Sequence, residues 1–254
     1  MELLLTFAAA AAILFLVIPG ASSTNISGGA AARPHSRPYM AFIKSSSKTC
    51  GGILVKDRWV LTAAHCNITK TTEVILGAHS ISRKEPEQQK FKVVKSFPYP
   101  CYSWNGFEND LMLLQLNGNI KRSKAVSPCP LPSTGDDDVK AGTKCQAAGW
   151  GVTDRHTRGI SNILMEVNIV IMNRNICNGH YKSRPAITRN MLCAGDTKGT
   201  CKGDSGGPLI CNGTLRGITA FGGNPCSTHK QPGVFTRLTD NYLNWIKKTT
   251  GGDL

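Results

Sequence analysis

Short apolar segments separated by turn-forming residues recur along the chain from Ile26 onward. These segments have the length of β-strands, and Gly, Pro, Asn and Asp residues lie between them. Eight strands are predicted, at residues 52–55, 59–62, 73–76, 111–116, 165–171, 208–211, 215–221 and 234–238. Strands that recur without long helices between them are typical of all-β barrels, so we predict that fold class.

One helix is predicted near the end of the chain. Asp240 is expected to cap it, and Tyr242, Trp245 and Ile246 fall on one face at helical spacing. The segment 131–142 is rich in Pro, Gly and Asp and is expected to link two β halves, about residues 26–135 and 136–254.

The first 23 residues differ from the rest. Residues 3–18 are almost wholly apolar and are followed by Pro19-Gly20 and the small residues 21–23, a pattern that resembles the core and cleavage site of a secretory signal peptide. The apolar run is shorter than the roughly 20 residues of a membrane helix. We therefore expect a signal peptide over residues 1–23, secretion, and no membrane span.

Cysteine content and glycosylation motifs agree with that destination. The chain has ten cysteines, which persist as disulfides in oxidising compartments. No Cys-x-x-Cys pair occurs, so a thiolate metal site is not expected. Asn25, Asn67 and Asn212 each begin an Asn-x-Ser/Thr acceptor motif, which predicts a glycoprotein.

The charge is strongly positive, with 30 Lys and Arg against 16 Asp and Glu and a formal net charge of +14 at pH 7. Such a charge promotes solubility and also attracts polyanions. Two basic groups stand out, namely Arg83, Lys84, Lys90 and Lys92, and then Lys121, Arg122 and Lys124, whereas residues 136–138 are acidic. The chain has no aromatic-interleaved basic stripe and no nucleic-acid motif, so nucleic acid is not an expected partner. We interpret the basic surface as a docking site for heparin-like proteoglycan.

The run Gly-Asp-Ser-Gly-Gly-Pro at residues 203–208 carries candidate chemistry. A serine between glycines in a tight turn can be an exposed nucleophile, but it needs a histidine to take its proton and a carboxylate to orient that histidine. His65 lies in Leu-Thr-Ala-Ala-His-Cys, and Asp110 begins Asp-Leu-Met-Leu-Leu. With Ser205, the order along the chain is His, Asp, Ser.

The segments around these three residues, together with Gly-Trp-Gly at 149–151, resemble the chymotrypsin-type serine peptidases over nearly the whole chain after the leader. Three further blocks, 34–40, 74–80 and 97–102, are similar to granzyme A and next to granzyme K. The resemblance implies two six-stranded antiparallel β-barrels with the active site between them and a C-terminal α-helix. It also implies a serine endopeptidase that needs no cofactor, takes protein substrates, is bound by serine protease inhibitors and is stored in the cytoplasmic secretory granules of cytotoxic lymphocytes.

The resemblance also assigns roles in catalysis. Ser205 attacks the peptide carbonyl, His65 takes and returns the proton, and Asp110 orients the imidazole. The backbone N–H groups of Gly203 and Ser205 form the oxyanion hole. Ala220 stands where the family usually has a serine that supports the aspartate, which is expected to weaken catalysis. This departure keeps an alternative open, a catalytically weak homologue that acts as a basic glycan-binding protein.

Activation follows from the same resemblance. A new N-terminus at Ile26, exposed by removal of the dipeptide Thr24-Asn25, is expected to pair its ammonium group with Asp204. Ser27 departs from the family, which usually has an apolar residue there. Because an α-amino group loses its charge near about pH 8, activity is expected to fall at alkaline pH.

Family pairing assigns eight cysteines to four disulfides, which are Cys50–Cys66, Cys145–Cys211, Cys177–Cys193 and Cys201–Cys226. Cys101 occupies the position that granzyme A uses for an interchain bond, so a disulfide-linked homodimer is one interpretation. An intrachain bond between Cys101 and Cys129 is the competing one.

The substrate pocket is where the resemblance breaks. Granzymes A and K carry an aspartate six residues before the nucleophile, and this chain has Gly199 there. The other expected pocket positions, which are Thr200, Ala220, Gly222 and Gly233, supply no carboxylate. A substrate guanidinium without a partner is costly in such a pocket, so an apolar or aromatic residue is expected before the scissile bond. Asp196, folded into the base through a shortened loop, is the alternative.

Overall fold

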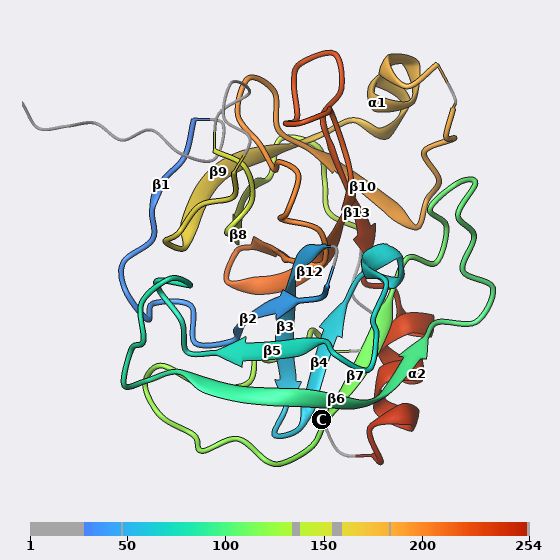
Figure 1. Cartoon of the computed structure of the whole chain (residues 1–254). Helices are drawn as coiled ribbons and strands as arrows, with labels where there is room; N and C mark the ends of the chain where they lie inside the picture. Colours follow the sequence, from blue (N-terminus) through green and yellow to red (C-terminus); the bar gives the residue numbers. More distant parts are fainter. Residues whose placement is uncertain (1–27, 47, 134–137, 154–158, 183, 253–254) are drawn as a thin grey trace, which may run out of the picture.

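The computed structural model describes residues 28–46, 48–133, 138–153, 159–182 and 184–252. It consists of two β-barrels with a helix, α2 (Asp240–Thr249), packed beside the first of them (Figure 1). The predicted signal peptide, the activation dipeptide and Ile26 all lie outside the described residues.

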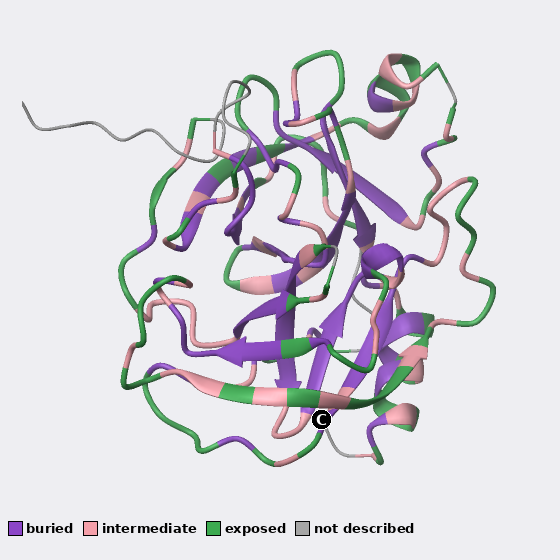
Figure 2. Ribbon diagram, in the orientation of Figure 1, coloured by how far each residue is buried: buried purple, intermediate pink, exposed green. Residues whose placement is uncertain are grey.

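The first barrel contains six antiparallel strands in the closed order β2-β3-β4-β7-β6-β5. Their bounds are β2 Met40–Lys44, β3 Thr49–Lys56, β4 Trp59–Thr62, β5 Glu73–Leu76, β6 Gln89–Pro98 and β7 Met112–Leu116. Barrel closure comes from β5, which pairs back onto β2 with Ala41 opposite Leu76. Figure 2 shows the inner strands almost wholly buried, whereas β6 runs along the outside with partly and fully exposed residues along it.

The second barrel closes in the order β8-β9-β10-β13-β12-β11, with β11 paired to β8. Its strands are β8 Lys144–Gly149, β9 Met165–Met172, β10 Met191–Ala194, β11 Pro208–Cys211, β12 Thr214–Phe221 and β13 Gly233–Arg237. A short strand, β1 (Ala30–Ala31), adds to the edge of β9, and a helix, α1 (Arg174–His180), connects β9 to β10. The predicted pair of six-stranded antiparallel barrels is therefore confirmed.

Alternating or continuously apolar segments were predicted well. The strands at 59–62, 73–76 and 208–211 have the predicted bounds, and the others differ by one to three residues at an end. The prediction missed β1, β2, β6, β8, β10 and α1. In β6, lysines alternate with partly buried residues, and barrel pairing, rather than local apolar content, holds such a strand in place.

The predicted C-terminal helix is present, and it buries the predicted face. Tyr242 and Ile246 are buried against the apolar cluster that also contains Trp59 and Leu113 of the first barrel. The helix begins at Asp240 and its N-cap position is Thr239, so the prediction that Asp240 is the cap is wrong. Thr239 holds the extended backbone of a capping position, and Asp240 instead places its charge in the first turn, where the helix dipole favours an anion.

Four disulfides join the cysteine pairs that the family resemblance implies, Cys50–Cys66, Cys145–Cys211, Cys177–Cys193 and Cys201–Cys226. Cys101 is exposed and Cys129 is buried, and the two do not form a bond with each other. Among the described residues, no helix has the length and apolarity needed to cross a membrane.

Candidate active site

His65 and Asp110 lie at the ends of two adjacent strands of the first barrel. His65 is on the 3-10 helix η1 (Ala64–Cys66), which follows β4, and Asp110 comes just before β7, the pairing partner of β4. The backbone N–H of His65 donates to Asp110 Oδ1 at 2.9 Å, and the His65 Nδ1 lies 2.7 Å from Asp110 Oδ2. An ionised carboxylate only accepts hydrogen bonds, so Nδ1 carries the proton and Nε2 is left as the acceptor.

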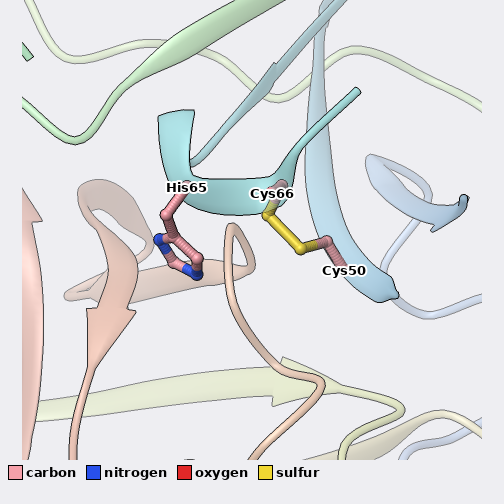
Figure 3. Close-up of side chains that lie close together, drawn as sticks. All are labelled: Cys50, His65 and Cys66. Carbon is pink, nitrogen blue, oxygen red and sulfur yellow. A yellow bond between two sulfur atoms is a disulfide. The ribbon is translucent and has the colours of Figure 1, made fainter. Parts of the chain in front are cut away.

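A disulfide anchors the helix that carries His65. Figure 3 shows the imidazole of His65 beside the Cys50–Cys66 bond, which ties η1 to strand β3. The histidine nitrogen and the two sulfurs lie within 4.8 Å of one another. Because both sulfurs are consumed in the disulfide, this trio offers no thiolate to a metal ion.

Ser205 lies in a turn held between the two barrels. The N–H of Gly51 in the first barrel donates to Ser205 O at 2.8 Å, and the N–H of Gly206 donates to Thr219 O of the second barrel at 2.8 Å. Gly206 has a φ of +80°, and a Cβ there would lie 2.2 Å from Thr62 Oγ1. The turn is therefore possible only with glycine beside the serine.

The backbone around Gly203 leaves two donors unused. Among the described residues, the amides of Gly203 and Ser205 donate to no acceptor. Gly203 has a φ of +103°, and a Cβ there would lie 3.0 Å from the Cα of Gly151. Such free backbone N–H groups beside Ser205 suit an incoming oxyanion.

Asp204, the residue before Ser205, is buried on the side of the turn that faces the second barrel. Its carboxylate accepts the N–H of Gly151 and the N–H of Cys201, each at 2.8 Å. Burial raises the pKa of Asp204 to about 6, and these two hydrogen bonds partly offset that rise. Its expected partner Ile26 lies outside the described residues, so the activation pair stays a prediction.

His65 and Ser205 face the same cavity of about 440 Å³. One side of this cavity is an aromatic wall, formed by Trp104, Phe107 and Phe221. The ring of Phe107 lies 5.8 Å from that of His65 and 5.0 Å from that of Phe221, measured between centroids. Sequence reasoning missed this wall, although two of its aromatic residues come shortly before Asp110 in the chain.

The expected pocket residues divide into two groups. Thr200, Ala220 and Gly222 line the cavity. Gly199 and Gly233 are not in its lining and instead contact Ser227, which the sequence analysis did not consider. Asp196 is exposed, and its Oδ1 lies 2.6 Å from Nδ1 of His229, so the alternative in which Asp196 folds into the pocket base is wrong.

Two antiparallel barrels that bring a buried His–Asp pair and a serine turn to one cleft define a serine endopeptidase of the two-barrel class. The chain belongs to the trypsin family, because the family model described as Trypsin matches residues 26–246. It is 49% identical to granzyme A of Bos taurus over 249 residues, covering 95% of each chain, and 41% identical to granzyme B of Homo sapiens, covering 93% of this chain and 96% of the relative. Among solved structures it resembles neuropsin, a serine protease expressed in the limbic system of mouse brain, with a TM-score of 0.79, 38% identity, and coverage of 87% of this chain and 98% of that one.

Proposed function

We propose that Ser205, His65 and Asp110 cleave peptide bonds through an acyl-enzyme on Ser205. The observation that carries this proposal is the double contact between His65 and Asp110, because it leaves Nε2 of His65 free to accept a proton. Ser205 attacks the carbonyl carbon as its proton passes to Nε2, and the peptide C–N bond then breaks as the proton moves to the leaving amine. Water releases the acyl group by the same route in reverse.

The amides of Gly203 and Ser205 hold the negative oxygen that forms in each tetrahedral intermediate. Removal of one such donor costs about 3 kcal/mol of transition-state stabilisation in related chemistry. Two features support their role, namely the absence of another acceptor among the described residues and the positive φ of Gly203, a conformation that glycine adopts readily.

Activation is proposed to depend on Asp204. Its carboxylate is buried with two backbone donors and no described cation. An ammonium group at Ile26, released when Thr24-Asn25 is removed after the signal peptide, would supply the missing charge. A chain that retains Thr24-Asn25 is therefore expected to be inactive.

A fluorophosphonate probe that forms a covalent bond with an activated serine tests the proposed chemistry. We expect labelling of Ser205 in the chain that begins at Ile26, and none in the matched Ser205→Ala variant. If the Ile26 chain were not labelled, the catalytically weak, glycan-binding alternative would be favoured instead.

The proposed biological role is that of a secreted, granule-stored protease of cytotoxic lymphocytes, in which protein substrates and serine protease inhibitors occupy the cleft. Similarity to granzymes A and B supports it. Asn67 is exposed at the C-terminal end of η1, and Asn212 is exposed in the turn between β11 and β12, which is compatible with glycan attachment. Killing of target cells by delivered wild-type protein, compared with Ser205→Ala, tests this role.

A second proposal is that the basic surface binds heparin-like proteoglycan. Its two groups of lysines lie side by side, because the Gln89 side chain exchanges hydrogen bonds with the backbone of Lys121. Lys90 and Lys92 are exposed on β6 next to this link. We expect Lys90→Gln/Lys92→Gln to elute from heparin at lower salt than the wild type, and Lys248→Gln on α2, outside the two basic groups, to shift less.

A covalent homodimer through Cys101 is also proposed, since this thiol is exposed and forms no intrachain bond. Electrophoresis without reductant is expected to show a dimer that Cys101→Ser abolishes. A band of monomer alone for the wild type would rule the covalent dimer out.

A further inference from the structure

Two hydroxyl groups lie next to each other at the cavity beside Ser205, one in its lining and one behind it. Thr200 lines the cavity. Ser227 lies against Thr200, and 0% of the surface of Ser227 is exposed. The N–H of Ser227 donates to Thr200 O at 2.8 Å, and the two side-chain oxygens are 3.4 Å apart. The Cys201–Cys226 disulfide joins the neighbouring residues of both segments, so the contact is held on each side.

Ser227 fills the space that the three pocket glycines surround. A Cβ on Gly199 would lie 2.8 Å from the Cβ of Ser227, closer than two nonbonded carbons approach. A Cβ on Gly222 or Gly233 would lie 2.9 or 3.2 Å from the Ser227 Oγ. These glycines therefore do not indicate an open chamber, because the side chain of Ser227 already occupies their common space.

We propose that Ser227 determines substrate specificity by closing this pocket, so that the residue before the scissile bond must have a small side chain such as Ala, Ser or Thr. The inference rests on the proposed role of Ser205. A substrate whose carbonyl carbon is at Ser205 would place the adjoining side chain in the cavity that Thr200 lines. A phenyl or leucyl group reaching deeper would have to displace Thr200 and Ser227 from a packed site, which is destabilising.

A basic side chain is excluded for a second reason. Neither Thr200 nor Ser227 carries a charge, and Asp196 is on the surface with His229. A guanidinium or ammonium group would lose water without gaining a carboxylate. The small-residue class thus replaces the broader apolar or aromatic preference that Gly199 alone suggests.

The test compares kcat/KM for peptide amides that differ only in Ala, Phe or Arg before the cleaved bond. We expect the wild type to favour Ala over Phe and Arg by at least about tenfold. Ser227→Gly removes the atoms that fill the pocket and is expected to raise kcat/KM for Phe relative to Ala by about tenfold or more. Ser227→Ala is the intermediate variant, because it keeps the Cβ facing Gly199 but removes the Oγ facing Gly222 and Gly233, and it is expected to change the preference less than Ser227→Gly.

A second experiment tests whether the pocket can be changed to accept Arg. Gly199→Asp alone places its Cβ against Ser227 and is expected to give no cleavage after Arg. Gly199→Asp/Ser227→Gly provides both the carboxylate and the space, so cleavage after Arg is expected to increase. Thermal unfolding of each variant identifies any that fails to fold.

Labelling of Ser205 by the fluorophosphonate separates the two proposals. A labelled wild type that prefers Phe or Arg over Ala overturns the role of Ser227, as does a Ser227→Gly variant with the same preference as the wild type. An unlabelled Ile26 chain overturns the proposed function itself, and the specificity inference with it.

Discussion

The carboxylate of Asp204 occupies the space in which a side chain on residue 151 would lie. A Cβ on Gly151 would be 2.5 Å from Asp204 Cγ, while the Gly151 N–H donates to Asp204 Oδ1 at 2.8 Å. Gly149 approaches the same carboxylate, with a Cβ position 2.2 Å from Oδ1. Glycine is therefore required at both ends of the Gly-Trp-Gly segment, because the carboxylate of Asp204, more than fifty positions later in the chain, lies so close to it.

Gly151→Ala is expected to destabilise the protein by about 1–3 kcal/mol, because the added methyl group cannot fit beside a buried carboxylate. Urea unfolding measures the change. Gly179→Ala in α1 is the matched control, since nothing lies within 4 Å of its Cβ position and alanine favours a helix. An equal loss of stability in both variants would contradict the steric argument.

The stability of the uncleaved chain is expected to depend on the ionisation of Asp204. Its pKa in the folded protein is about 6, against an ordinary value of 3.8. A carboxyl group with a raised folded pKa contributes stability below about pH 4, and this contribution is lost as the pH rises through 6. The loss is on the order of 3 kcal/mol, since one pKa unit corresponds to about 1.4 kcal/mol.

Urea unfolding of the uncleaved Ser205→Ala protein between pH 4 and pH 7 tests this dependence, with Asp204→Asn in the same background as the reference that cannot titrate. The difference between the two curves isolates Asp204. In the chain that begins at Ile26, an ammonium partner would favour the carboxylate and the slope is expected to weaken or reverse. No difference between Asp204 and its Asn variant would contradict the prediction.

Asp110→Asn is expected to lower kcat by about four orders of magnitude, the size of the effect in the corresponding aspartate variant of a related protease. An amide can donate to Nδ1 of His65 and so favours the tautomer in which Nε2 carries the proton. Steady-state kinetics measures the loss. Asp57→Asn, at an exposed aspartate that pairs with Arg122, is the control and should leave kcat nearly unchanged.

The two unpaired cysteines are expected to react very differently with iodoacetamide at pH 8. Burial raises the pKa of the Cys129 thiol to about 12, so it stays protonated and enclosed. Cys101 is exposed and should be modified once any intermolecular bond has been reduced mildly. Peptide mass mapping of the native protein distinguishes the two sites, and modification of Cys129 before unfolding would contradict its buried position.

The candidate site residues could be predicted from short motifs because each motif also contains residues that its local backbone conformation or strand requires. The run at 203–208 needs glycine at positive φ on both sides of the serine turn, and the strand at 59–62 begins with three apolar residues and leads to η1. Family resemblance supplied the barrel count and the four disulfide pairs. Strand β6 was missed because six of its ten residues are exposed and none is fully buried, so the segment lacks the apolar content by which the other strands were predicted.

By itself, the sequence determined the all-β fold class and the class of chemistry, since the serine turn, the histidine and the aspartate each occur within a recognisable stretch of chain, and the resemblance of these stretches to a family implied the two barrels. Only the tertiary structure decided what surrounds Gly199. Ser227 lies beside Gly199 although it comes from another segment, which the Cys201–Cys226 disulfide joins to the segment of Gly199. Asp204 likewise lies beside Gly151, a residue far from it in the chain. Contacts of this kind depend on which distant segments the barrels bring together. The space between two such segments is set by tertiary packing, so it cannot be predicted from a local sequence pattern.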